Sequence, residues 1–239
     1  MIRMTTLAGK VRRQYRDLGL FETLRYSAMR AIDVTQENIF DLAHRVDTAG
    51  VTLPIVNGGH GYKGSLPHLV RAILNTVVVP YKDYTFIDLG SGKGRTLLIA
   101  SEFPFRGIVG IEFDPILNTI AQLNFTRYRT KRRNCRMLES VCGDVRDFDL
   151  PPEPLFIYLF NPFEESIIRT ILENLERSLQ QNPRPVLMVY LRPVFEGAVE
   201  RAGFLKRVGY RENRLIPNYS YAVYRNLPVD PVGYAVPAT

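Results

Sequence analysis

The chain has 239 residues, 46% hydrophobic and 23% charged, a composition typical of globular proteins that excludes a mainly disordered or collagen-like chain. Lysine and arginine number 31 against 24 aspartates and glutamates, which gives a net charge of +7. A chain of this length buries roughly 70–75% of its unfolded surface, enough for one large domain or two small ones. Every apolar run is far shorter than the roughly 18 residues of a membrane-spanning helix, so no membrane span is predicted.

The N-terminus, cysteines and histidines predict a cytoplasmic protein without a metal. Basic residues are scattered through the first 16 positions, where a signal peptide needs an unbroken apolar core. Cys135 and Cys142 have no second pair and no nearby histidine, so we expect two reduced cysteines in the core. His44, His60 and His68 lie far apart in the sequence, which argues against a metal site.

The first part of the chain is basic and helical in pattern. Helices are predicted at about residues 6–31 and 33–44, followed by a glycine-rich loop at 47–65. We assign residues 1–65 to an N-terminal helical and lid extension. A helix at about 66–77 then begins the main domain.

Strand-like and helix-like segments alternate from residue 84 onward. Apolar runs predict strands at 84–89, 107–112, 137–142, 155–160 and 185–191. Asp114 can cap a helix that begins at Pro115, in which Ile116, Ile120 and Leu123 recur at helical spacing. Another predicted helix has an apolar stripe made of Ile168, Ile171, Leu172, Leu175 and Leu179.

The end of the chain completes the sheet. A short helix at 195–202 precedes two strands, 204–210 and 219–224, which we expect to pair antiparallel at one sheet edge. The pattern predicts an α/β fold, a doubly wound, mostly parallel seven-stranded sheet covered on both faces. We assign residues 66–225 to this domain and expect a loosely ordered tail at 226–239.

The most informative segment is FIDLGSGKGRTLLIA, residues 86–100, in which a strand breaks into alternate glycines before a helix. Such glycines allow a sharp turn and bring backbone N–H groups close to a ligand. The phosphate-loop pattern fails, since it needs Gly at Ile87 and Ser or Thr at Gly94. The dinucleotide pattern is weakened because Arg95 stands where it needs a small residue.

The segment DLGSGKG, residues 88–94, resembles the first motif of the class I S-adenosylmethionine-dependent methyltransferases, which have a Rossmann-like fold. The resemblance continues at the ends of the following strands. Glu112 stands where an acid accepts both ribose hydroxyls, and Asp144-Val145 where the family contacts the adenine. Asp144 also suits a simple turn.

Two further segments extend the resemblance. Asn161-Pro162-Phe163 follows the fourth strand, at the family's substrate-facing motif, although Asn161 also suits a helix cap. GYKGS, residues 61–65, is similar to the Y-x-P-[ST] segment that covers the methionine end of the cofactor in lysine methyltransferases lacking a SET domain, with Gly64 in place of Pro. Together with FDLAHRVDTAGV and VGIEFDP, these segments resemble a group of uncharacterised bacterial methyltransferases.

The resemblance implies S-adenosylmethionine as cofactor and a set of contact residues. These are Tyr62, Ser65, Asp88, Gly90, Ser91, Gly92, Gly94, Glu112, Asp144, Val145 and Asn161. It implies that Asn161 and Phe163 contact the methyl acceptor, because amino-group methyltransferases carry [DNS]-P-P-[YFW] at this place. This favours an amino nitrogen as acceptor, in a protein side chain or a small molecule. Because this chain has one proline fewer than that motif, oxygen and carbon acceptors stay open.

Two other functions fit parts of the sequence. An NAD-dependent oxidoreductase shares the strand, the glycine loop and the acid after the second strand. A non-catalytic module could bind nucleic acid through the basic run at 127–136, although a solvated helix end is the preferred interpretation of that run.

Overall fold

The computed structural model describes residues 7–50, 62–160, 163–213 and 219–226, and side chains from residue 24 onward. Its helices are α1 (Leu7–His44), α2 (Pro67–Thr76), the 3-10 helix η1 (Tyr81–Asp83), α3 (Arg95–Ala100), α4 (Pro115–Arg127), α5 (Glu165–Gln181) and α6 (Glu196–Arg201). Its strands are β1 (Thr85–Leu89), β2 (Gly107–Glu112), β3 (Leu138–Cys142), β4 (Leu155–Phe160), β5 (Val186–Leu191), β6 (Leu205–Arg211) and β7 (Tyr221–Asn226). The predicted strands and helices of the main domain are all present.

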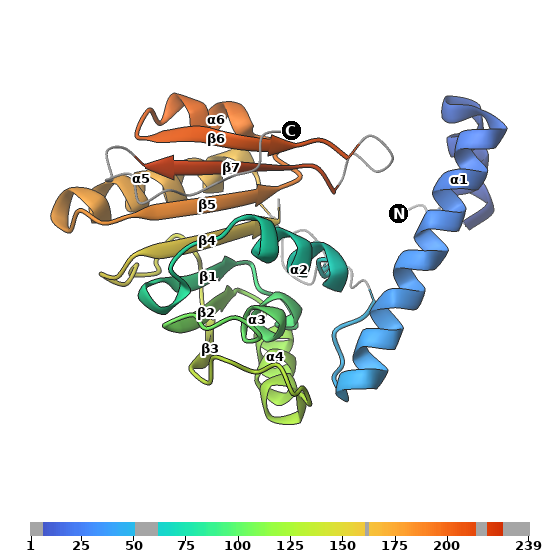
Figure 1. The fold of residues 1–239 in the computed structure, drawn as a ribbon. Coiled ribbons are helices and arrows are strands. Elements are labelled where there is room, and N and C mark those ends of the chain that lie inside the picture. The colour runs from blue at the N-terminus through green and yellow to red at the C-terminus, as the bar shows by residue number, and fades with distance from the viewer. Residues whose placement is uncertain (1–6, 51–61, 161–162, 214–218, 227–239) are drawn as a thin grey trace.

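The seven strands form one sheet in the order β3-β2-β1-β4-β5-β7-β6 (Figure 1). The first five strands are parallel, and β7 pairs antiparallel with both β5 and β6. This arrangement confirms the predicted fold class. The strand order reverses between β1 and β4, and ligands of open α/β sheets bind at the carboxyl ends of the strands beside such a reversal.

Helices cover both faces of the sheet. On one face Phe40 of α1 and the apolar side chains of α2 and α3 pack on Phe86, Phe156 and Tyr158. On the other face α5 and α6 pack on a second apolar cluster that includes Ile87. Figure 1 shows α2 in front of the sheet and α5 behind it. The central strands β1 and β4 are apolar throughout because both of their faces are buried.

The N-terminal extension corrects one prediction. The two helices expected at 6–31 and 33–44 are a single helix, α1. Asp33, expected to lie at a helix start, is buried within α1, where it accepts a hydrogen bond from the Tyr219 hydroxyl and lies 3.7 Å from Arg30. Because the Asp33 carboxylate has these partners, it does not need to cap a new helix, and α1 continues through it.

Helix α4 begins as predicted but turns another face to the sheet. The Asp114 carboxylate caps it by accepting from the backbone N–H groups of Ile116 and Leu117. Ile116 and Leu123, expected on the packed stripe, are 57% and 45% exposed. The buried side chains are Leu117, Asn118, Ala121 and Asn124. Asn118 tolerates burial because it accepts a hydrogen bond from Ser140 (2.6 Å).

The cysteines differ in burial. Cys135 is buried in the core as expected, but Cys142 is exposed, which corrects the prediction for that residue. Cys142 is the last residue of β3, and β3 is an edge strand with a neighbour on one side only. Among the described residues, no helix is long and apolar enough to cross a membrane.

Candidate functional site

The glycine loop joins β1 to α3 and has the backbone that its sequence predicts. Gly90, Gly92 and Gly94 have φ angles of 85°, 55° and 81°, a region that glycine enters without steric cost. The N–H groups of Gly90 and Ser91 donate to the carbonyl oxygen of Ile111 in β2 (2.9 and 3.0 Å). The loop is therefore fixed to the neighbouring strand at the carboxyl edge of the sheet.

Glu112, at the end of β2, lies against this loop. One carboxylate oxygen accepts from the N–H of Gly92 (2.7 Å) and the other from the N–H of Asp114 (2.8 Å). Each carboxylate oxygen has two acceptor sites, so each can accept one more hydrogen bond from a ligand. Burial raises the pKa of Glu112, while the N–H groups of Asp114 and Gly92 act in the opposite direction.

Asp88, in β1 beneath the loop, is only 3% exposed. Burial and the nearby Glu112 carboxylate raise the pKa of Asp88 to about 8. A hydrogen bond with Thr96 acts in the opposite direction but is the smaller effect. At neutral pH Asp88 is therefore mostly protonated. The Asp88 side chain thus joins the end of β1 to Thr96 of α3 inside the fold.

Ser91 also faces the interior. A Cβ added to Gly110 of β2 would lie 2.6 Å from the Ser91 hydroxyl, so Ser91 fills space above that strand. The hydroxyl oxygen of Ser91 is buried without a hydrogen-bond partner among the described residues.

The predicted lid residues Tyr62 and Ser65 lie next to the loop. A Cβ added to Gly92 would lie 2.3 Å from the Tyr62 ring, so this ring packs directly on the glycine backbone. The Tyr62 hydroxyl donates to the carbonyl oxygen of Thr48 (2.7 Å), and burial raises its pKa. Ser65 faces the sheet, where its hydroxyl accepts from Tyr158 of β4 (2.9 Å). Tyr62 thus covers the loop, and Ser65 fixes the segment that carries it.

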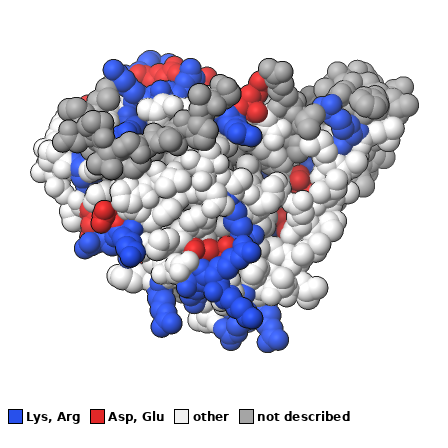
Figure 2. Space-filling view, in the orientation of Figure 1, with Lys and Arg blue, Asp and Glu red and all other residues white. Residues whose placement is uncertain are grey.

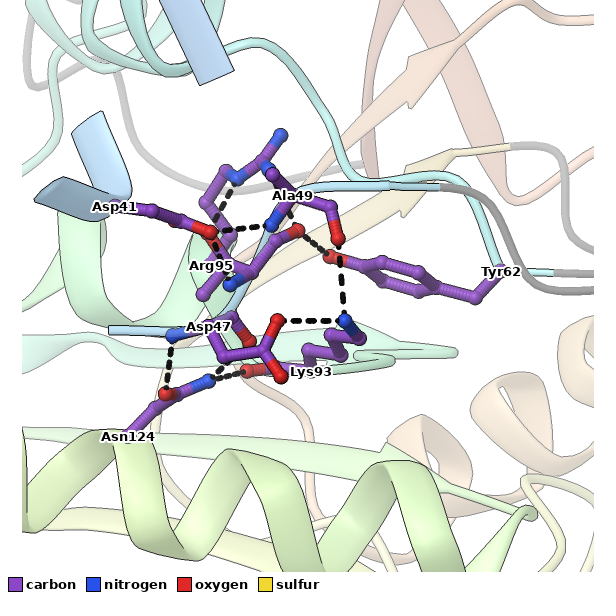
Figure 3. A network of polar contacts seen from close by, with 8 residues as sticks. Asp41, Asp47, Ala49, Tyr62, Lys93, Arg95 and Asn124 are labelled. Carbon is purple, nitrogen blue, oxygen red and sulfur yellow. Dashed lines mark hydrogen bonds and ion pairs between the residues drawn. The ribbon is translucent and has the colours of Figure 1, made fainter. Parts of the chain in front are cut away.

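A segment after α1, residues 47–49, binds the glycine loop through polar contacts (Figure 3). The Lys93 ammonium lies 2.8 Å from an Asp47 carboxylate oxygen and donates to the carbonyl oxygen of Ala49 (3.1 Å). The Asn124 side chain of α4 accepts from the N–H of Asp47 (2.9 Å) and donates to the carbonyl oxygens of Asp47 (2.9 Å) and Lys93 (3.0 Å). The extension, the loop and α4 are joined at this point.

Arg95, which follows the last glycine, is 1% exposed and belongs to the same network (Figure 3). Its guanidinium donates to the Thr48 hydroxyl (2.8 Å) and to the carbonyl oxygens of Thr48 and Ser65, and lies 3.5 Å from Glu37 of α1. The sequence identified Arg95 only as an obstacle to dinucleotide binding. Its role was missed because Glu37 and Thr48 lie 58 and 47 positions earlier in the chain.

Three other predicted site residues, Asp144, Val145 and Phe163, have contacts of their own. Gly143, just before Asp144, donates its N–H to the carbonyl oxygen of Glu112 (3.0 Å). The Asp144 carboxylate accepts from the N–H of Arg146 (2.9 Å) and forms an ion pair with its guanidinium (2.6 Å), which lowers the pKa of Asp144. Val145 and Phe163 are partly buried against the cluster beneath α5. Asn161 lies outside the described residues. At the loop itself the structure brings together the predicted residues Tyr62, Ser65, Asp88, Gly90, Ser91, Gly92, Gly94 and Glu112.

Phe113, which the sequence analysis did not single out, directly follows Glu112, and 54% of its surface is exposed. The sequence signal that could have drawn attention to Phe113 is an aromatic residue directly after the acid at the end of a strand. Within the described residues, no group of histidine, cysteine, aspartate and glutamate side chains could hold a metal ion.

Comparisons with known proteins agree with this geometry at the level of the fold. No protein-family model and no curated protein matches the chain. The glycopeptide N-methyltransferase MtfA, complexed with sinefungin, is similar at 10% identity over 70% of this chain and 95% of that chain, with a TM-score of 0.51.

Two other solved structures are longer than this chain. The mitomycin 7-O-methyltransferase MmcR is 13% identical over 67% of this chain and 52% of that one, with a TM-score of 0.48. The tRNA (uracil-54, C5)-methyltransferase of Pyrococcus abyssi is 12% identical over 66% of this chain and 36% of that one, with a TM-score of 0.46. The chain thus spans about half and about a third of their lengths. With its strand order and its similarity to MtfA, the chain has the fold of the class I S-adenosylmethionine-dependent methyltransferases.

Proposed function

We propose that the protein is an S-adenosylmethionine-dependent methyltransferase that transfers the methyl group to an amino nitrogen. The observation that carries this proposal is the contact between Glu112 and the glycine loop, which leaves both carboxylate oxygens able to accept from the two ribose hydroxyls. MtfA, which has a similar fold, has been solved with S-adenosylmethionine and with sinefungin, and this supports the cofactor.

The bound cofactor would supply a methyl group already activated on a sulfonium, so the protein has to align and desolvate the reactants. In this proposal Glu112 binds the ribose, Phe113 packs beside the adenine, Asp144 and Val145 line its far side, and Tyr62 excludes water from the loop. Asn161 and Phe163 are assigned to the acceptor from the sequence motif. The Asn161 oxygen would accept from an uncharged amine and direct its lone pair, in a protein side chain or a small molecule.

Calorimetry tests the cofactor site. We expect micromolar affinity for S-adenosylmethionine and none for NAD, because the loop and Glu112 suit an adenosyl group while Arg95 departs from the dinucleotide pattern. Glu112→Ala should weaken cofactor binding by about 1.5–3 kcal/mol, roughly 10-fold to 150-fold, through the loss of charged hydrogen bonds. The matched control is Glu139→Ala, an exposed acid in β3, which should bind as the wild type does. Unchanged affinity in the Glu112 variant, or binding of NAD, contradicts the site.

Labelling tests the reaction. The protein is incubated with tritiated-methyl cofactor and a cell lysate that is then separated into protein, nucleic acid and small molecules. Label in protein or in a small amine is the expected result. Label found only in nucleic acid would show that the acceptor is a nucleic acid and not the proposed amine. The absence of label from every fraction would contradict methyl transfer.

A further inference from the structure

A hollow lies away from the glycine loop, where α4 ends. Its volume is about 680 Å³, and it is lined by His44, Arg71, Glu102, Arg129, Thr130, Lys131 and Arg132. Figure 2 shows lysine and arginine side chains gathered on this part of the molecule around a small acidic patch. We term it the basic hollow.

The positive charge of the basic hollow is concentrated in one segment. Residues 127–136 contain six cations and no acid: Arg127, Arg129, Lys131, Arg132, Arg133 and Arg136. Across the described residues, none of the six forms an ion pair with a carboxylate. Like charges this close repel one another, so an anionic ligand would relieve the repulsion.

Glu102, the acid within the basic hollow, is already paired with Arg71, which also lines the hollow. It accepts two hydrogen bonds from Arg71 (2.7 and 2.9 Å) and one from the Tyr128 hydroxyl (2.7 Å). Burial opposes the charge on Glu102, but these bonds outweigh it and lower the pKa. Glu102 therefore offsets the charge of Arg71 and part of the charge of Arg132, whose guanidinium also lowers the pKa of Glu102. The charges of Arg129 and Lys131 and the rest of that of Arg132 remain available to a ligand.

The backbone of this segment is held in place before any ligand arrives. His44 Nδ1 donates to the carbonyl oxygen of Arg129 (2.6 Å), and the N–H of Arg129 donates to the carbonyl oxygen of His44 (3.1 Å). At the other end, Asn134 donates to the carbonyl oxygens of Ser101 (2.8 Å) and Glu102 (2.7 Å). A fixed backbone reduces the ordering entropy that binding would cost.

We propose that the basic hollow binds the phosphate backbone of a single-stranded RNA segment. The aromatic rings beneath it, Phe40 and Tyr128, are 4% and 3% exposed, so phosphates rather than base faces would be contacted. A DNA duplex is a stiff cylinder and a bilayer is a flat surface, and both would meet only the rim of a hollow. Unpaired loops and bulges of RNA are flexible enough to enter it.

Binding is tested by fluorescence anisotropy with a fluorescein-labelled unstructured 12-nucleotide RNA between 50 and 200 mM KCl, without cofactor. Each phosphate contact with a single strand contributes about 0.7 to the slope of log K against log salt. Replacing Arg129, Lys131 and Arg132 together by Gln should reduce the slope by about 2 and the affinity at 0.1 M salt by roughly 100-fold. The three side chains are exposed, so the fold should be unaffected.

The matched control removes the same net charge elsewhere. Replacing Arg177, Lys206 and Arg211, all exposed on α5 and β6, by Gln should leave RNA affinity within a few-fold of the wild type. Equal losses in the two triple variants would show that only net charge matters, and this would overturn the proposal. Absence of RNA binding, equal affinity for duplex DNA, or equal binding to phosphatidylserine vesicles would each overturn it as well. Because no cofactor is present, these results do not depend on the proposed methyl transfer.

Discussion

Asp88 should make the stability of the protein depend on pH. Its pKa in the unfolded chain is near 3.9, and in the folded chain it is raised to about 8. Between these values the folded chain holds a proton that the unfolded chain has released. The stabilising contribution of Asp88 is thus fully present below about pH 4 and is lost as the pH rises to about 8.

Asp88→Asn should therefore become more stable relative to the wild type as the pH rises, since an amide has no charge to desolvate. Calorimetric unfolding of both proteins at pH 5, 6.5 and 8 measures this difference. Asp149→Asn, a change to an exposed acid in the loop after β3, serves as the control and should track the wild type. A stability difference between the Asp88 variant and the wild type that stays constant over this range would argue against the raised pKa.

At the residue scale, the sequence predicted the part of the site that lies within one strand–loop–helix unit. The positive φ angles of the glycines follow from local sequence, and the position of Glu112 follows from the pairing of β1 with β2. The burial of Arg95 depends on Thr48 and Glu37, which local sequence does not bring near it. The Asp144–Arg146 ion pair joins two residues that are close in the sequence. The pattern of hydrophobic residues nevertheless does not predict which partner a charged side chain in a turn will bind.

At the element scale, the contacts of Arg95 should stabilise the packing of α1 and of residues 47–49 on the sheet domain. Arg95→Gln leaves the buried Glu37 without its cation and removes donors to Thr48 and Ser65. Breaking a buried pair costs about 3–5 kcal/mol, which for a chain of this size lowers the melting temperature by roughly 6–20 °C.

The control for Arg95 is an exposed pair. Arg106 lies 3.4 Å from Glu153, with its side chain 58% exposed, so Arg106→Gln should cost less than about 1 kcal/mol. Thermal unfolding followed by circular dichroism compares the two variants. Similar melting temperatures for both would mean that the Arg95 contacts contribute little.

The spacing of hydrophobic residues predicted the strands and the helices of the sheet domain, because each element buries an apolar face against its neighbours. The predictions for α1 and for the buried face of α4 were wrong, because polar contacts are part of the packing there. Helix α1 continues through the expected break, and Asp33 bonds to Tyr219 instead of capping a new helix. Helix α4 buries Asn118 and Asn124, and both have hydrogen-bond partners. Such partners lie between 22 and 186 positions away, beyond any local pattern.

At the scale of the whole molecule, several polar contacts join the described part of the extension to the sheet domain. They include the network of Asp47, Thr48, Lys93 and Arg95, the Tyr219–Asp33 bond between the approach to β7 and the second half of α1, the Tyr158–Ser65 bond and the two bonds between His44 and Arg129. Units joined by buried polar contacts tend to unfold together, because opening one exposes unpaired groups in the other.

We therefore expect residues 1–65 and 66–225, although distinct in sequence pattern, to melt in one transition. Differential scanning calorimetry should give a calorimetric enthalpy close to the van't Hoff value. Since the proposed cofactor site takes Tyr62 from the extension and Glu112 from the sheet, S-adenosylmethionine at 100 times its Kd should stabilise the whole transition by about 2.7 kcal/mol, raising the melting temperature by roughly 5–11 °C. NAD at the same concentration is the control. Two resolved transitions, only one of which moves with S-adenosylmethionine, would mean that the extension and the sheet fold independently.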